Sequence, residues 1–208
     1  MKKLVLKTSF ITFGVTIILL VSVFGILSLF VPYEMSDFSL SIGLDTLSGD
    51  YAYQEYERSG SVRYLARSFE IASQGGSAQK AEHRFELLIE HEEFDSYCEK
   101  QDANSAQSST TPHYRYRDYI YGRGACVKYR LAKTEAEMRR VCRFALDNTG
   151  ESFRSGNPYV LLAIDAANKN DGSFCKILLE ETDSSGMEFE QNSDYASIRK
   201  ILEGCANE

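Results

Sequence analysis

The sequence begins with a long uncharged stretch, which restricts the possible folds more than any other feature. No acidic or basic residue occurs from Thr8 to Tyr33, and residues 10–31 are apolar around the whole circumference of a helix. A helix rises about 1.5 Å per residue, so this run would extend about 33 Å, close to the hydrocarbon thickness of a bilayer. Pro32 can end the segment, and Tyr33 stands where an interfacial aromatic residue belongs. We therefore expect residues 10–31 to form a transmembrane helix.

The alternative interpretation of this run is a cleaved signal peptide, whose apolar region has about 7–15 residues and ends in a small-x-small cleavage site. Here the run is longer, and residues 29–34 offer no such site, so we expect an uncleaved signal-anchor. Three lysines precede the run and two acids follow it, and positive charge favours the cytoplasmic side. The sequence predicts a single-pass plasma-membrane protein with residues 1–9 in the cytoplasm and residues 36–208 outside the membrane.

The part beyond the anchor is acidic, because residues 36–208 contain 20 basic and 29 acidic residues. A net charge of about −9 argues against a nucleic acid partner. All the cysteines lie in this part, at spacings that match no zinc pattern: Cys98, Cys126, Cys142, Cys175 and Cys205. Their number is odd, so at least one is unpaired within the chain. Disulfides are permitted outside the membrane, and the sequence leaves open whether the others are buried thiols or form one or two bridges.

Apolar residues beyond the anchor recur at helical spacing, whereas strand-type alternation is rare. The clearest start is a capping box at Thr134 and Glu137, followed by an apolar stripe. We expect short amphipathic helices over about 38–58, 61–74, 77–100, 114–132, 134–148, 157–167, 173–182 and 193–206. The predicted fold class is all-α, with antiparallel helix hairpins that form either an array or an irregular bundle. A polar, Ser/Thr-rich segment, residues 101–113, is expected to be a flexible loop.

One stretch of about a single repeat resembles a tetratricopeptide-type helix hairpin. The family places an aromatic residue in the first helix, a glycine at the turn, and an aromatic residue and an alanine in the second helix. The matching positions in this sequence are Tyr56, Gly60, Phe69 and Ala72. Leu65 and Ala66 stand where the family usually has Ala and Leu. The resemblance implies a tetratricopeptide-like (TPR-like) array that binds a peptide or protein in a groove.

Charge is segregated along the exterior part. Residues 82–99 contain seven acids and one base, whereas residues 113–143 contain nine bases and three acids. In a functional interpretation, the Tyr/Arg-rich segment binds an anionic lipid headgroup, an acidic wall polymer or an acidic peptide through Tyr114, Arg115, Tyr116, Arg117 and Arg123. In the structural interpretation, which we favour, the acidic helix packs beside the basic helices, and each exposed pair contributes about 0–1 kcal/mol.

No complete catalytic or cofactor-binding motif occurs in the sequence. His83 shares a helical face with Glu86 and Glu90, but a second Glu-x-x-His is absent. His91-Glu92 lacks the second histidine of a zinc protease, and no phosphate-binding glycine motif is complete. We therefore expect no cofactor or metal. The leading hypothesis is a membrane-tethered interaction or scaffold module that binds a protein partner in a cell-envelope complex. The alternatives are a sensor for an anionic envelope ligand and an unrecognised hydrolase.

Overall fold

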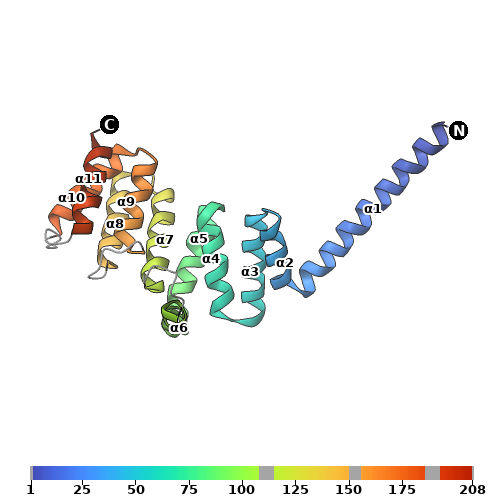
Figure 1. Cartoon of the computed structure of the whole chain (residues 1–208), viewed down its shortest axis with the longest axis horizontal. Coiled ribbons are helices and arrows are strands. Elements are labelled where there is room, and N and C mark those ends of the chain that lie inside the picture. Colours follow the sequence, from blue (N-terminus) through green and yellow to red (C-terminus); the bar gives the residue numbers. More distant parts are fainter. Residues whose placement is uncertain (1, 108–114, 150–155, 186–192, 208) are drawn as a thin grey trace.

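The chain is described by a computed structural model that covers residues 2–107, 115–149, 156–185 and 193–207. In these ranges the structure is all-α and contains no strand, which confirms the predicted fold class at that level. Figure 1 shows one long helix projecting from a row of shorter helices. The side chains of residues 2–11, 28, 107 and 193–194 are not among those described.

The described residues form eleven helices. The first six are α1 (Lys2–Phe30), α2 (Pro32–Ser41), α3 (Asp45–Ser59), α4 (Val62–Gly75), α5 (Ala78–Glu90) and α6 (Phe94–Gln107). The others are α7 (Tyr116–Leu131), α8 (Glu135–Asp147), α9 (Pro158–Asn168), α10 (Gly172–Ser184) and α11 (Ser193–Ala206). Helices α2 to α5 pack in chain order as a row, whereas α7 to α11 pack on one another as a bundle (Figure 1).

Several helix ends follow directly from the sequence. The predicted capping box is confirmed: the Thr134 hydroxyl accepts from the Glu137 N–H, while the Glu137 carboxylate accepts from the Thr134 N–H. Asn157 caps α9 by accepting from the N–H groups of Tyr159 and Val160. The stretch that resembles a tetratricopeptide hairpin forms α3 and α4, and Gly60 ends α3 in the left-handed region with φ of 69°. Membership of that family stays a prediction.

The helix predicted over 38–58 is divided into α2 and α3, because Gly43 adopts a φ of +75° and ends the first helix. The helix predicted over 77–100 is likewise divided, since the chain is extended at His91. In α7, Gly122 and Gly124 lie within one continuous helix rather than interrupting it. Packing explains the glycine at 124, because a Cβ there would lie 2.4 Å from Cε2 of Phe85.

The prediction of a flexible loop at 101–113 is wrong for residues 101–107, which continue α6 to Gln107. This part contains neither glycine nor proline, so nothing in its backbone opposes a helix. The carboxylate of Asp102 also accepts a hydrogen bond of 2.6 Å from the backbone N–H of Tyr116, which ties α6 to the start of α7. Residues 108–113 lie outside the described part of the chain.

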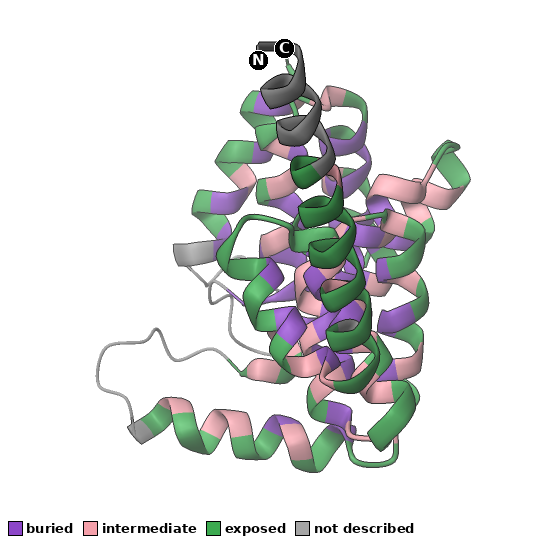
Figure 2. Cartoon of the chain, turned by 90° about the vertical axis from the view of Figure 1, so that its right-hand side faces the viewer, coloured by how far each residue is buried: buried purple, intermediate pink, exposed green. Residues whose placement is uncertain are grey.

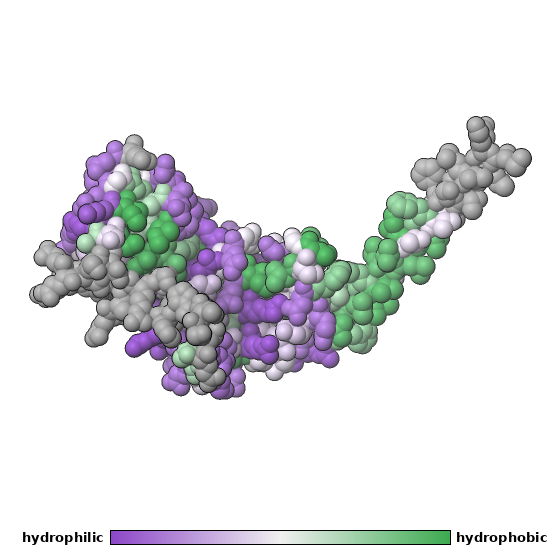
Figure 3. Space-filling view, in the orientation of Figure 1, coloured by the Kyte–Doolittle hydropathy of each residue, from purple (hydrophilic) through white to green (hydrophobic). Residues whose placement is uncertain are grey.

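Helix α1 has 29 residues and leaves the body of the molecule at its C-terminal end (Figure 1). Near that end, the ring of Phe24 lies 6.4 Å from those of Phe38 and Tyr51. Most of its described apolar side chains are exposed, as the hydropathy-coloured surface in Figure 3 shows. No helix among the described residues is both long and apolar enough to qualify as a bilayer span.

Two hydrophobic cores stabilise the described part of the body. Figure 2 colours the buried residues, which recur along the helices of the body. The first core lies among α4 to α7 and includes Phe69, Phe85 and Leu88. The second lies among α7 to α11 and includes Tyr159 and Phe174. Helix α7 contributes to both, with Ile120 and Val127 in the first core, and Ala125 and Tyr129 in the second. The row and the bundle are therefore joined through α7.

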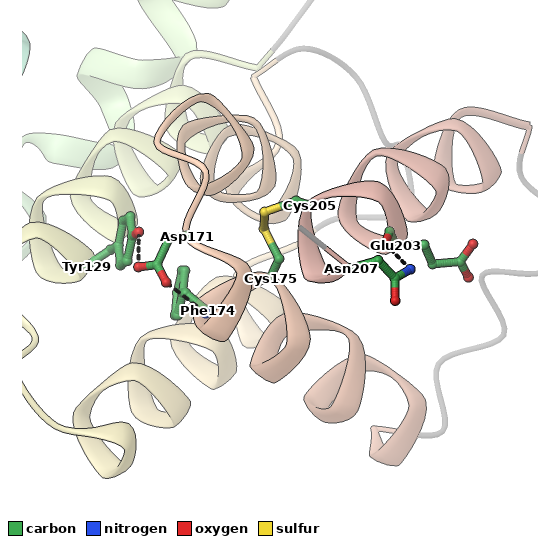
Figure 4. The surroundings of a disulfide bond; sticks show 7 residues. All are labelled: Tyr129, Asp171, Phe174, Cys175, Glu203, Cys205 and Asn207. Carbon is green, nitrogen blue, oxygen red and sulfur yellow. Dashed lines mark hydrogen bonds between the residues drawn. A yellow bond between two sulfur atoms is a disulfide. The ribbon is translucent and has the colours of Figure 1, made fainter.

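The five cysteines, whose pairing the sequence left open, form one disulfide and three free thiols. A disulfide joins Cys175 of α10 to Cys205 of α11 (Figure 4). Cys98 and Cys142 are buried thiols, and Cys126 is half-buried. Near the bridge, the Asp171 carboxylate accepts two hydrogen bonds, from the Tyr129 hydroxyl at 2.6 Å and from the Phe174 N–H at 3.0 Å (Figure 4). The C-terminal hairpin is thus closed covalently and also attached to α7.

Candidate partner-binding surface

The structure separates the residues that the sequence grouped into one Tyr/Arg-rich site. Tyr114 lies outside the described residues. Arg115 is exposed at the N-cap position of α7. Tyr116 contacts α4 and α6, Arg117 contacts α6, and Arg123 contacts α4. The segment is therefore not a single open face directed toward solvent.

Tyr116 forms part of a half-buried polar cluster between α4, α6 and α7. Its hydroxyl donates to the Glu70 carboxylate at 2.8 Å, and its ring lies 5.6 Å from that of Tyr97. Burial raises the pKa of Glu70, although the bond from Tyr116 and the charges of Arg123 and Arg67 oppose this. Burial also raises the pKa of Tyr116, so the phenol stays protonated and remains a donor. This cluster joins three helices and leaves the Tyr116 hydroxyl engaged inside the domain.

Two of the three arginines of the predicted site, Arg117 and Arg123, also have partners in the domain. Arg117 forms an ion pair of 2.7 Å with Asp95, and its guanidinium lies 5.9 Å from the centre of the Phe94 ring. The Nε–H of Arg123 donates to the Ser73 hydroxyl at 3.2 Å. Both side chains connect α7 to neighbouring helices, which reduces their availability for an external anion.

Charge compensation within the domain, the interpretation favoured from the sequence, is confirmed between α5 and α7. The Lys128 ammonium lies 3.5 Å from the Glu82 carboxylate and 3.3 Å from that of Glu86. The same ammonium lies over the rings of Phe85 and Phe144, at 5.7 and 5.8 Å from their centres. The acidic helix and the basic helix therefore pack against each other through named pairs.

A hollow of about 540 Å³ lies where α5, α7 and α8 meet. Its apolar lining comes from Leu131, Val141 and Phe144, and its charged lining includes Lys128 and Arg140. Arg140 is exposed, whereas the lining apolar residues are buried or half-buried. An apolar floor with charges at its margin suits a side chain or short segment of another protein better than a small anion alone.

Sequence reasoning missed this hollow, although most of its lining lies within the basic segment 113–143. Two apolar residues, Leu131 and Val141, lie on either side of the short connection between α7 and α8. They were the part of the sequence that could have indicated an apolar hollow there. Nothing in the sequence places α5 against that connection. A long-range packing contact is needed to form the site.

A second cleft, of about 360 Å³, lies along α3 and α5. Arg84 lies there, 5% exposed, and donates to Asp50 at 2.5 Å and to the Ser68 carbonyl at 3.3 Å. Burial would raise the pKa of Asp50, but hydrogen bonds from Lys80 and Arg84 outweigh it and lower the pKa. Asp50 is thus held as a carboxylate by two cations, which is a structural arrangement rather than that of an acid or nucleophile.

The free thiols among the described residues are not activated as nucleophiles. Burial raises the pKa of the Cys98 and Cys126 thiols to about 12, so both are neutral near pH 7. Among the side chains that the structure describes, no three His, Cys, Asp or Glu residues gather in a metal-binding arrangement. Comparison with known protein families, with curated proteins and with solved structures finds no match to the chain. Interpretation of its role therefore depends on its own geometry.

Proposed function

We propose that this chain is a membrane-tethered helical module that presents its domain to a protein partner in a cell-envelope complex. The observation that carries the proposal is the apolar surface of α1 (Figure 3): most of its described apolar side chains are exposed, whereas the apolar side chains of the two cores are buried. A contiguous apolar surface of this extent is unfavourable in water, and a lipid environment would cover it.

The tether is proposed from the sequence together with the exposure of α1. The apolar run covers residues 10–31. The full run is the length on which the proposal depends, since about 20 apolar residues are needed to cross a bilayer. The lysines that precede it favour a cytoplasmic N-terminus in the plasma membrane.

The disulfide supports an exterior position for the domain. Bridges such as Cys175–Cys205 persist in oxidising compartments and are rare in reducing ones. This support is independent of the lysine argument, because it comes from the opposite end of the chain.

A protein partner is favoured over an anionic ligand because the Tyr/Arg-rich segment and the hollow differ in which of their side chains are available to a partner. Tyr116, Arg117 and Arg123 all have partners inside the domain. The hollow between α5, α7 and α8 instead combines an apolar floor with the exposed Arg140. The TPR-like resemblance, which implies binding of a peptide or protein, agrees with this choice.

The tether is tested by adding charge to α1. Leu20→Arg combined with Val21→Arg should release the protein into the alkaline-carbonate supernatant, because each arginine at a helix centre costs about 2.5–3.5 kcal/mol of insertion energy. Ile201→Arg, which places the same charge at an exposed position of α11, should stay in the membrane pellet. Complete extraction of the wild-type protein by carbonate would contradict the tether.

The partner surface is tested by photo-crosslinking in intact membranes. A photoreactive phenylalanine replaces Arg140 beside the hollow or, as the matched control, the exposed Lys200 on α11. We expect a discrete crosslinked protein from position 140 that is absent from position 200. Equal products at both positions, or none at either, would count against the hollow as a partner site.

A further inference from the structure

A group of large apolar side chains is exposed where α2 turns into α3. The exposed fractions are 50% for Phe38, 42% for Leu40, 53% for Ile42 and 46% for Leu44. Asp45 is the only charged residue from Phe38 to Leu47. Outside α1, the body exposes few other large apolar side chains among the described residues, namely Ile164 and Ile201. Exposed apolar side chains outside α1 are therefore concentrated at the α2–α3 turn.

This turn lies on the side of the body from which α1 projects. Helices α1 and α2 meet at Val31, and both rise from that junction in Figure 1. Phe24, seven residues before Val31, contacts Phe38 and Tyr51. Seven residues correspond to about 10 Å along a helix, so Phe38 lies beside α1 well within the apolar run.

We propose that the α2–α3 turn, through Phe38, Leu40, Ile42 and Leu44, inserts into the headgroup–acyl boundary of the bilayer beside α1. The inference rests on the proposed tether. If residues 10–31 cross the bilayer, the contact with Phe24 carries Phe38 about 10 Å below the end of the apolar run. Interfacial apolar segments are buried about 5–10 Å, so the turn lies at a depth where lipid accepts its side chains.

Polar groups lie at the α1–α2 junction, nearer the end of the apolar run than Phe38, at the level expected for the lipid headgroups. The Arg58 guanidinium donates to the Phe30 carbonyl at 3.1 Å, and that of Arg63 lies 5.8 Å from the centre of the Tyr33 ring. Both arginines are exposed, and neither forms an ion pair with another described residue. Arginine and tyrosine at the end of an apolar helix are suited to phosphate and the interface.

Lipid, rather than a protein, is the occupant because the patch is continuous with α1. Phe38 contacts Phe24, a residue of the apolar run itself, so whatever surrounds α1 at that level also reaches the turn. The turn is also open, since nothing described lies within 4 Å of a Cβ built at Gly43. Two attachments, α1 and the turn, would restrict rotation of the helix row about the junction at Pro32.

The absence of tryptophan from the sequence permits a direct test. Ile42→Trp gives the full-length protein a single tryptophan at the turn, and Leu19→Trp gives one within α1. Ile201→Trp is the matched control, because Ile201 is 45% exposed and lies on α11. Each protein is reconstituted into phosphatidylcholine vesicles with or without bromine on the acyl chains, which quenches only nearby tryptophan.

We expect brominated lipid to quench Leu19→Trp and Ile42→Trp, with blue-shifted emission from both, and to leave Ile201→Trp unquenched. Quenching at position 19 without quenching at position 42 would overturn the inference and leave the tether standing. No quenching at position 19 would overturn the tether itself, and the inference with it. The two failures are therefore distinguishable.

Leu44→Trp repeats the measurement at the other side of Gly43, so misfolding of one variant does not remove the test. Circular dichroism of each variant checks that its helix content is unchanged. Quenching at position 44 equal to that at position 42 supports insertion of the whole turn. Emission at 44 that resembles the Ile201→Trp control would contradict it.

Discussion

The two cores of the body are stabilised by different means. The first, among α4 to α7, depends on aromatic packing around Phe85, whose ring lies 5.4 Å from that of Phe69 and 5.9 Å from those of Tyr121 and Phe144. The second, among α7 to α11, has the Cys175–Cys205 bridge at one side. The part nearer the proposed tether therefore relies on shape complementarity, and the part farther away also has covalent closure.

The polar groups of the two regions differ in the same way. Near the first core, the half-buried Glu70 accepts a hydrogen bond from the neutral phenol of Tyr116. Near the second core, Glu181 accepts from Arg143 at 2.7 Å and from Arg139 at 3.0 Å. The first arrangement penalises a charge and the second stabilises one. Because α7 belongs to both cores, we expect the two regions to unfold together.

The largest expected effect comes from emptying a core. Phe85→Ala and the matched Phe174→Ala should each lower the free energy of unfolding by about 3–5 kcal/mol, because each removes a fully buried ring. Urea unfolding followed by far-ultraviolet circular dichroism measures the loss. If α7 couples the cores, each variant keeps one transition. Two separated transitions in either variant would show that the regions unfold independently.

Removing the disulfide should have the next largest effect and should act on the second region. The bridge closes a loop with a sequence separation of 30, for which the chain-entropy relation gives about 3–4 kcal/mol. Cys175→Ser combined with Cys205→Ser should therefore lower the unfolding midpoint and raise amide exchange in α10 and α11. Adding reductant should destabilise the wild type but not this double variant. Equal sensitivity of both to reductant would contradict the assignment.

A smaller effect is expected at the buried arginine beside the first core. Arg84→Met should cost about 1–3 kcal/mol, since it removes the hydrogen bonds to Asp50 and to the Ser68 carbonyl. Lys80→Met removes an exposed cation from the same aspartate and should cost about 0–1 kcal/mol. Denaturant midpoints of both variants measure the difference. A larger loss for Lys80→Met than for Arg84→Met would contradict the importance of burial.

The smallest effects should appear as opposite responses to acid. Burial raises the pKa of Glu70 above 4.5, so its favourable contribution is complete below that value and is lost as pH rises through the folded pKa. The hydrogen bond from Arg143 lowers the pKa of Glu181, so its contribution is present above 4.5 and is lost as pH falls through the folded pKa.

Acidification from pH 7 to pH 4 should therefore increase the stability of the wild type relative to Glu70→Gln and decrease it relative to Glu181→Gln. Unfolding free energies of the three proteins along this pH range measure both trends. Trends of the same sign would show that the two carboxylates do not differ in the way described.

Local signals in the sequence predicted much of the fold. Helix starts at Thr134 and Asn157 were visible because a side-chain acceptor stands directly before an apolar stripe. The break at Gly43 was missed because apolar residues flank it, whereas turns usually contain several polar residues. Gly124 lies within the helix predicted over 114–132, but the contact that explains this glycine is with Phe85, 39 positions earlier. Contacts of that range are not encoded in local periodicity.

The candidate site was less predictable than the fold. Segregated charge correctly indicated pairing between α5 and α7, because opposite charges on neighbouring helices tend to face each other. It did not indicate the hollow, which forms only where α5 packs against α7 beside α8. Residues 38–44 were predicted to belong to the helix over 38–58, and the exposure of this turn is evident only once α2 packs beside α3.

The sharing of α7 between both cores also defines how mechanical load would pass through the molecule. If the protein is held by α1 and pulled through a partner at the hollow, tension enters at α2 and must cross α3 and α4 to reach α7. None of those helices is joined by a covalent cross-link in the described chain, and the bridge lies beyond the point of pulling. The row would therefore extend before the bundle, so the domain would yield on its membrane side while the Cys175–Cys205 hairpin kept its shape.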